Sequence, residues 1–141
     1  MRKIQDGFTL VELMLTVAII GILAAIISIN YGSSIQKSSE ALTKGNLGAI
    51  RSALSIYYGD NEGNFPYDDL TSISNNGRYL LKFPITRIQP YHSDTTLVTP
   101  ETSVSETGGW SYNNSDDSAG WGNIHVGCLH QDSRSLVWSS Y

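Results

Sequence analysis

The side chains best suited to bind a metal ion or to act as a nucleophile lie near the C-terminus, at His125, Cys128 and His130. Thiolate and imidazole groups are ligands that zinc prefers, and a cysteine beside a histidine can also form a nucleophile pair. In an extended strand, side chains alternate between two faces, so Cys128 and His130 are expected on one face and His125 on the other. Because zinc sites recruit a larger set of spaced ligands, we expect a small buried cysteine here and no functional site.

A second group of candidate ligands is the acidic pair Asp116 and Asp117, in the turn sequence from Asn113 to Ser118. Their carboxylate oxygens suit calcium, but a calcium site needs roughly six to eight oxygen ligands. We therefore predict that the protein has no metal or other cofactor, and we keep calcium at Asp116 and Asp117 as an alternative.

A third candidate, Glu12, is a carboxylate at the start of an apolar run. The residues from Leu13 to Ile27 include no charged residue and no proline. As a helix, the segment 8–29 would be about 33 Å long, which matches the roughly 30 Å hydrocarbon core of a bilayer. This segment is therefore predicted to be a membrane-spanning helix.

Glu12 needs an explanation, because an acidic side chain at the centre of a bilayer costs about 2.5–3.5 kcal/mol on insertion scales and usually has a function. Its natural partner is a positive charge from another molecule. Cleavage of the chain after Gly7 would create such a charge, as a free amino terminus on Phe8. The sequence thus predicts a processing site between Gly7 and Phe8 and an assembly role for Glu12.

The run Gly7-Phe8-Thr9-Leu10-Val11-Glu12, followed by the apolar segment that contains Gly21-Ile22-Leu23-Ala24-Ala25, resembles the N-terminus of type IV pilins and type II secretion pseudopilins. This resemblance implies that prepilin peptidase removes residues 1–7 and that the new terminal residue, Phe8, is N-methylated. It also implies that Glu12 pairs with the terminal amine of a neighbouring subunit. Two departures from the family pattern are Asp6 beside the cleavage site and the lack of a proline before Gly63.

The resemblance implies partners as well. They are prepilin peptidase, copies of the chain and other pilins or pseudopilins, the inner-membrane assembly platform, and membrane lipid before assembly. Arg2 and Lys3 precede the apolar segment and favour a cytoplasmic N-terminus, with the chain after Asn30 exported. We expect a single-pass protein of the bacterial inner membrane that later enters a pilus or a periplasmic pseudopilus. Two other interpretations, a secretory signal peptide and a simple membrane anchor, leave Glu12 unexplained.

After Ser33 the pattern becomes that of a helix with one apolar face. The apolar positions are Leu42, Ala49, Ile50, Ala53, Leu54 and Tyr57, while Lys37, Glu40, Lys44 and Arg51 are expected to point elsewhere. Both halves are predicted to form one long helix from Phe8 to about Tyr58. The cluster from Gly59 to Asn64, with Pro66 beyond it, should end this helix and resembles the helix-to-loop junction of pseudopilins.

The remainder is predicted to be a connecting loop, with one short strand at most, over 59–107 and a sheet over 108–141. Strands are expected at 109–112, 122–128 and 136–141, because aromatic and β-branched residues there alternate with turn-forming segments. The buried face should include Trp110, Ile124, Val126 and Trp138. The predicted fold is α+β: a long N-terminal helix packed on a small antiparallel sheet of three or four strands, in the ladle shape typical of the family.

These features divide the chain into a leader at 1–7, a membrane and assembly segment at 8–29, and an exported domain at 30–141 that begins with the second half of the helix, 30–58. A net charge of −4 leaves no basic excess for nucleic-acid binding, and the single cysteine excludes an intrachain disulfide. We expect a structural subunit of a pilus or pseudopilus and no enzyme. The alternative is an exported enzyme or binding domain on a simple anchor, using His92, His125, Cys128 or His130.

Overall fold

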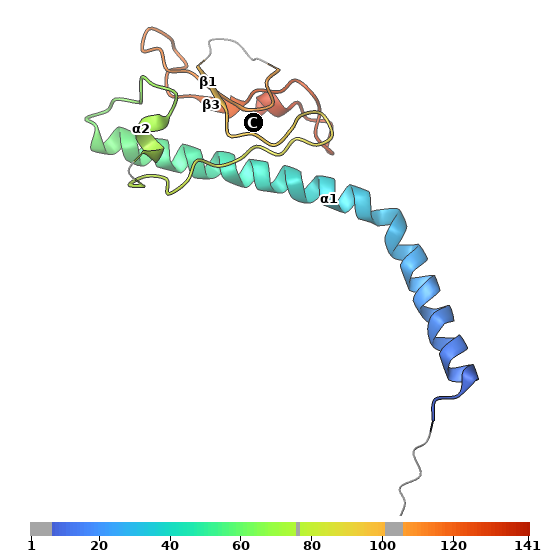
Figure 1. The fold of residues 1–141 in the computed structure, drawn as a ribbon. Coiled ribbons are helices and arrows are strands. Elements are labelled where there is room, and N and C mark those ends of the chain that lie inside the picture. Colours follow the sequence, from blue (N-terminus) through green and yellow to red (C-terminus); the bar gives the residue numbers. More distant parts are fainter. Residues whose placement is uncertain (1–6, 76, 101–105) are drawn as a thin grey trace, which may run out of the picture. The chain divides into compact units, whose positions relative to one another are not determined.

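A computed structural model describes residues 7–75, 77–100 and 106–141 of the chain. The chain divides into two compact units, Met1–Ile35 and Gln36–Tyr141 (Figure 1). Each unit is described by itself below. Arg2, Lys3 and Asp6, on which the leader and topology predictions depend, lie outside the described residues.

The dominant element is the helix α1, which runs from Leu10 to Asp60. In the first unit, its segment Leu10–Ser28 is long and apolar enough to cross a membrane by length and composition, and none of it is buried within the protein. The helix begins two residues later than predicted, because the backbone of Phe8 and Thr9 is not helical.

In the second unit, α1 supplies one side of the hydrophobic core. Leu47, Ile50, Ala53 and Leu54 are buried there, and Tyr57 packs against them. Two predictions for this face were wrong, since Leu42 and Ala49 are exposed and the face is instead extended by buried Thr43. The helical spacing therefore identified the buried face but assigned two exposed residues to it.

The predicted polar face also differs at two positions. Glu40 is buried and accepts hydrogen bonds from the backbone N–H and the hydroxyl of Ser133, the former at 2.9 Å. Lys44 donates to the Asp132 carboxylate at 2.5 Å and to the Tyr141 hydroxyl at 2.7 Å. Both charged side chains thus bind the C-terminal segment, a contact that helical periodicity cannot predict because the partners are distant in sequence.

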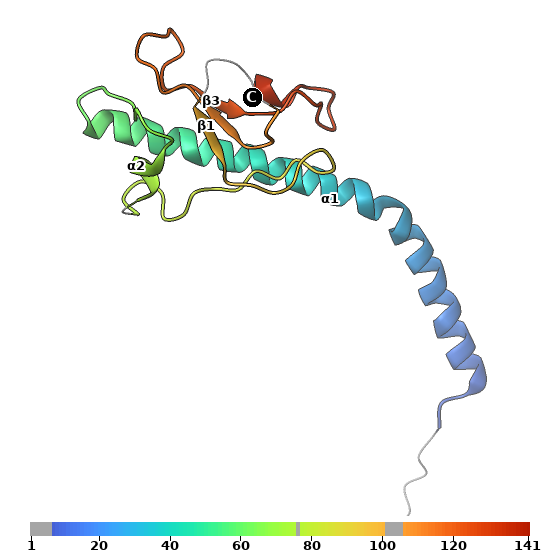
Figure 2. The same ribbon diagram turned by 45° about the horizontal axis from the view of Figure 1, so that its top comes forward.

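A three-stranded sheet covers the second half of α1 (Figures 1 and 2). Its order is β1 (Val98–Pro100), β2 (Trp110–Tyr112) and β3 (Ile124–Val126). The antiparallel pair β2–β3 lies where two of the predicted strands were expected, with Trp110 opposite Val126. A short helix, α2 (Thr71–Ser74), lies in the segment predicted to be a loop.

The sheet is mixed, whereas an antiparallel sheet was predicted. Strand β1 pairs with β2 in parallel, with Val98 opposite Trp110. A three-residue strand is only about 10 Å long. The chain between Pro100 and Trp110 is therefore long enough for β2 to begin beside the start of β1. Parallel pairing is consequently within reach without the helix that usually connects parallel strands.

The third predicted strand, 136–141, was wrong. The segment forms an isolated bridge between Gln131 and Val137, followed by the 3₁₀-helix η1 (Trp138–Ser140). The cause is a turn centred on Asp132, whose Oδ1 accepts hydrogen bonds from the backbone N–H groups of Arg134 and Leu136. The four residues predicted to be buried, Trp110, Ile124, Val126 and Trp138, are all confirmed in the core.

Candidate functional site

The start of α1 is fixed by a reciprocal pair of contacts between Thr9 and Glu12. The backbone N–H and hydroxyl of Thr9 donate to Oε2 of Glu12 at 2.9 and 2.7 Å, and the backbone N–H of Glu12 donates to the Thr9 hydroxyl at 3.2 Å. This is a capping box, in which the first donors of a helix are satisfied by two side chains three residues apart. Sequence analysis missed the role of Thr9, although the Thr-x-x-Glu spacing carries that signal.

The capping box leaves part of Glu12 available. Among the described residues, Oε2 is the only carboxylate oxygen of Glu12 that accepts a hydrogen bond, so Oε1 can accept one from outside the chain. Gly7 and Phe8 precede the helix in non-helical backbone and are exposed. The peptide bond between Gly7 and Phe8 is accordingly accessible to a protease.

The helix that follows presents apolar side chains on all sides. The large apolar residues of the segment Leu10–Ser28 range in exposure from 50% at Ile19 to 75% at Leu10. A folded protein in water rarely leaves a contiguous apolar surface of this kind uncovered. This surface therefore requires lipid or other protein molecules to cover it.

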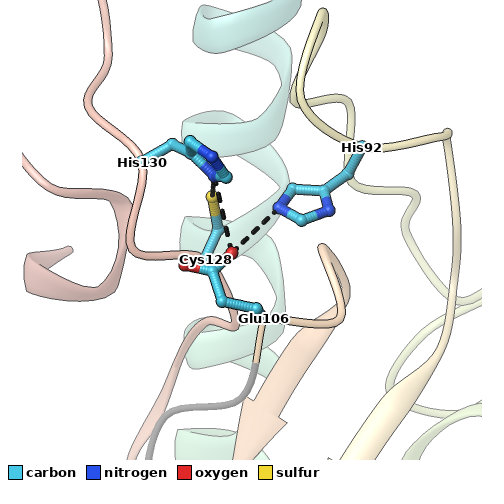
Figure 3. A group of neighbouring side chains, drawn as sticks. All are labelled: His92, Glu106, Cys128 and His130. Atoms are coloured by element: carbon cyan, nitrogen blue, oxygen red, sulfur yellow. Dashed lines mark hydrogen bonds and ion pairs between the residues drawn. The ribbon is translucent and has the colours of Figure 1, made fainter.

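A second cluster of reactive side chains lies in the second unit. Four side chains there each offer one potential metal-ligand atom, and these four atoms all lie within 4.8 Å of one another (Figure 3). The residues are His92, Glu106, Cys128 and His130. Oε2 of Glu106 lies 3.2 Å from Nε2 of His92 and 3.5 Å from Nδ1 of His130. The Cys128 sulfur lies 3.4 Å from the same Nδ1 atom.

Cys128 and His130 were predicted to share one face of a strand, but β3 ends at Val126 and both residues follow it. Their side chains are nevertheless in contact, and the predicted burial of Cys128 is confirmed. His125 is not part of the group and instead lines a recess with Arg51 and Tyr141. The sequence patterns did not predict that His92 and Glu106 belong to the same group as Cys128 and His130. These two residues come from segments distant from Cys128, so no local spacing signals them.

The loop that carries His92 is held in place by polar contacts at its base. Thr86 and Thr95 pair as an antiparallel bridge, and Arg87 forms an ion pair with Asp94 at 2.7 Å. The His92 side chain packs against Gly108, where a Cβ atom would lie 2.4 Å from the histidine and where φ is +71°. Only glycine fits there, since other residues combine a steric clash with an unfavourable left-handed backbone.

Stacking and burial restrain the other members of the cluster. The ring of Tyr91 stacks on that of His130 with centroids 4.0 Å apart. Burial raises the pKa of the Cys128 thiol, and the negative charge of Glu106 raises it further. A backbone hydrogen bond at His130 lowers this pKa, but the net effect is an increase. A thiol of this kind is a poor nucleophile, because nucleophilic cysteines have lowered pKa values and are partly exposed.

The cluster also lacks the geometry of a catalytic triad. In a triad, the histidine contacts the nucleophile through one ring nitrogen and the carboxylate through the other. Here Cys128 and Glu106 both approach Nδ1 of His130. The four side chains converge on one point and do not form a chain for proton transfer.

The predicted calcium candidates lie elsewhere. Asp116 and Asp117 are exposed in a turn between β2 and β3, and neither belongs to a group of three or more potential metal ligands among the described residues. Calcium binding at these two residues stays a prediction.

Comparisons with known proteins found one matching family model and several relatives. Residues 2–28 match the family model of the prokaryotic N-terminal methylation motif. The chain is 37% identical over 83 residues to the fimbrial protein EcpC of Eikenella corrodens, covering 57% of this chain and 54% of that protein. It is 42% identical over 60 residues to the type II secretion system core protein G of Pseudomonas aeruginosa, covering 43% of this chain and 42% of that protein.

A third relative is the type IV major fimbrial protein FimA of Dichelobacter nodosus, which is 46% identical over 54 residues, covering 38% of this chain and 35% of that protein. The chain is thus similar to type IV fimbrial proteins and to a type II secretion core protein, and it carries the N-terminal motif at residues 2–28. The chain spans about half or less of the length of these curated relatives. No solved structure matches it.

The family match separates the two groups of residues. Gly7, Phe8, Thr9 and Glu12 lie within the matched methylation motif. The cluster around Cys128 lies outside it. The N-terminal residues can thus be interpreted as those of a pilin-like protein, whereas the cluster must be interpreted from its own geometry.

Proposed function

We propose that this pilin-like protein is a structural subunit of a type IV pilus or a type II secretion pseudopilus. It is made as a precursor, cut between Gly7 and Phe8 by prepilin peptidase, methylated at Phe8, and polymerised through the first half of α1. The observation that carries this proposal is the apolar segment Leu10–Ser28, none of which is buried within the protein, with a single carboxylate, Glu12, at its start. The methylation motif and the names of the relatives support it.

The apolar segment is covered in two successive environments in this proposal. Before assembly, lipid surrounds it, since its length suits a bilayer core. In the filament, the same segments from neighbouring subunits replace the lipid. The second unit needs no such cover, because its apolar core is already buried within the chain.

Glu12 has two roles in the proposal, one for each carboxylate oxygen. Oε2 caps the helix of its own chain through Thr9. Oε1 accepts a hydrogen bond from the terminal amine of Phe8 in the next subunit. A charge-assisted bond of this kind is strong where water is excluded, and a carboxylate left unpaired in an apolar bundle is costly. The pair therefore selects one register between adjacent subunits.

The proposed location and partners follow from this cycle. The precursor is a single-pass protein of the bacterial inner membrane, with residues after Asn30 exported. Its partners are prepilin peptidase, the assembly platform, lipid, and further pilins or pseudopilins. We infer no catalytic activity, since the buried thiol of Cys128 and the convergent contacts at His130 suit neither a nucleophile nor a proton relay.

Three variants separate the two roles of Glu12. Glu12→Gln keeps the shape of the side chain and an acceptor for the cap but removes the charge. Thr9→Ala removes the cap's hydroxyl and keeps the charge. Glu12→Ala keeps that hydroxyl but removes both the charge and the carboxylate that accepts hydrogen bonds from Thr9. Incorporation into filaments is measured by comparing sheared or pelleted filaments with the membrane-bound pool, in cells that express each variant at the wild-type level.

We expect Glu12→Gln and Glu12→Ala each to lower incorporation by roughly ten-fold or more, because the neighbour's amine loses its counter-charge. Thr9→Ala should stay within about two-fold of wild type, since loss of a cap costs only about 1 kcal/mol. Normal incorporation of Glu12→Gln would refute the charge pairing. An equal loss in Thr9→Ala would assign the role of Glu12 to helix capping alone.

A further inference from the structure

We propose that His92, Glu106, Cys128 and His130 form a structural zinc site in the second unit. The four potential ligand atoms are one sulfur, two ring nitrogens and one carboxylate oxygen (Figure 3). Thiolate, imidazole and carboxylate are the groups that hold Zn²⁺ in proteins. The site is independent of the assembly segment and of the proposed function.

The distances fit a tetrahedral ion. Bonds of about 2.0–2.3 Å to a central zinc place neighbouring ligand atoms roughly 3.3–3.8 Å apart. The separations in the structure are 3.2 Å between Nε2 of His92 and Oε2 of Glu106, 3.5 Å between Nδ1 of His130 and Oε2 of Glu106, and 3.4 Å between the Cys128 sulfur and Nδ1 of His130. Every remaining pair of ligand atoms lies within 4.8 Å, so small side-chain movements would complete the tetrahedron.

The surroundings orient the ligands toward a common point. The backbone N–H of Leu129 donates to Oε1 of Glu106 at 2.6 Å, which directs Oε2 into the cluster. The stacked Tyr91 ring fixes the plane of His130, and the contact with Gly108 fixes His92. Contacts that orient the ligands in this way are typical of metal sites and raise metal affinity.

The ligand set indicates both the ion and its role. A buried sulfur and two imidazoles suit a borderline-soft ion such as zinc, whereas calcium requires more ligands and oxygen alone. Four protein ligands fill a tetrahedral site and leave no open position for a substrate. The site is therefore structural.

The topology shows what such an ion would stabilise. His92 lies in the loop closed by the Thr86–Thr95 bridge, Glu106 precedes β2, and Cys128 and His130 follow β3. An ion bound to all four would crosslink these three segments at one end of the sheet. In a chain with one cysteine, zinc would supply the constraint that an intrachain disulfide cannot.

The test uses the full chain, purified in detergent without a histidine tag and with its thiol reduced. Co²⁺ is added as a spectroscopic probe and is then displaced with Zn²⁺. We expect one Co²⁺ per chain, with visible absorption of tetrahedral intensity and a thiolate-to-metal charge-transfer band, both lost when Zn²⁺ is added. Saturating Zn²⁺ should raise the melting temperature of the second unit by about 5 °C or more.

Single substitutions identify the ligands. His92→Ala and His130→Ala should each weaken Zn²⁺ binding by roughly 100-fold, and Cys128→Ser should abolish the charge-transfer band. His125→Ala is the matched control, because this histidine lies in β3 outside the cluster and should leave the affinity unchanged. His130 is partly exposed, with 43% of its side chain accessible, so its variant tests the site even if Cys128→Ser fails to fold.

Three results would overturn the proposal. One is the absence of stoichiometric Co²⁺ or Zn²⁺ binding by the folded wild-type chain, in which case the cluster is a set of ordinary histidine–glutamate ion pairs. Another is Zn²⁺ binding that survives both His92→Ala and His130→Ala. A third is binding that is lost in His125→Ala.

Discussion

The two halves of α1 differ in what covers their apolar side chains. In the first unit, Ile20 is 64% exposed, and the large apolar residues near it are exposed to a similar degree. In the second unit, Ile50 is fully buried. Both residues are isoleucines in the same helix. The difference shows that one half of the helix is adapted to surroundings outside the chain and the other half to its own sheet.

The sequence patterns of the two halves explain this difference. The segment Leu10–Ser28 is apolar around its whole circumference, which suits a helix surrounded by lipid or by other helices. Beyond Gln36 the buried apolar residues, among them Leu47, Ile50 and Leu54, share one face of the helix, and this face packs into the core of the second unit. A helix can thus continue between two environments while its side-chain pattern changes.

The largest effect that tests this comparison is expected from a matched pair of substitutions, Ile50→Ala and Ile20→Ala. Ile50→Ala should lower the free energy of unfolding of the second unit by about 2–5 kcal/mol, because it leaves a cavity in a packed core. Ile20→Ala should change the same quantity by less than about 0.5 kcal/mol. Chemical denaturation of the full chain in detergent, followed by tryptophan fluorescence, measures both.

The fluorescence signal suits this measurement because Trp110 and Trp138 lie in the core of the second unit. If Ile20→Ala destabilised that unit as much as Ile50→Ala, the two halves would not differ in the way described. Equal and negligible effects of both substitutions would show that α1 does not supply the core.

A smaller effect is expected at the polar contact between α1 and the C-terminal segment. Asp132 is buried and accepts hydrogen bonds from Lys44 and Tyr141. Asp132→Asn should lower the free energy of unfolding by about 2 kcal/mol at pH 7, since Lys44 loses its counter-charge in a partly buried position. Asp60→Asn, which removes the more exposed ion pair with Arg78, is the control and should cost less than about 1 kcal/mol.

This contact also predicts a dependence on pH. Burial alone would raise the pKa of Asp132, but the hydrogen bonds from Lys44, Tyr141 and two backbone N–H groups outweigh it and hold the pKa well below its usual value. The stabilisation is therefore complete above the unfolded-state pKa of about 4 and is lost progressively as the pH falls toward the folded-state pKa. Unfolding curves of wild type and Asp132→Asn should converge at low pH, and a constant difference down to pH of about 2 would contradict this assignment.

Much of the fold was predictable because its signals are local. The long helix follows from an uninterrupted pattern without proline, and β2 and β3 follow from aromatic and β-branched residues around Trp110 and Ile124. The parallel pairing of β1 and the burial of Glu40 depend on contacts between distant segments. Sequence patterns have no access to such contacts.

The candidate sites show the same division. Glu12 stands out because it is a charge within an apolar run, and Cys128 and His130 stand out because they are two residues apart. His92 and Glu106 carry no local signal, since the fold alone brings them beside Cys128. Thr9 is an intermediate case, because its spacing from Glu12 is a known capping pattern that sequence analysis did not use.

The central claim, that the chain is a pilin-like subunit made by cleavage after Gly7, is tested most directly by mass spectrometry of the protein extracted from membranes. The terminal peptide and the intact mass are measured in cells with prepilin peptidase and in cells without it. We predict a mature chain that begins at Phe8 and carries one methyl group on its amine when the peptidase is present, and the uncut precursor when it is absent. A chain that begins at unmodified Met1 in both strains would contradict the claim.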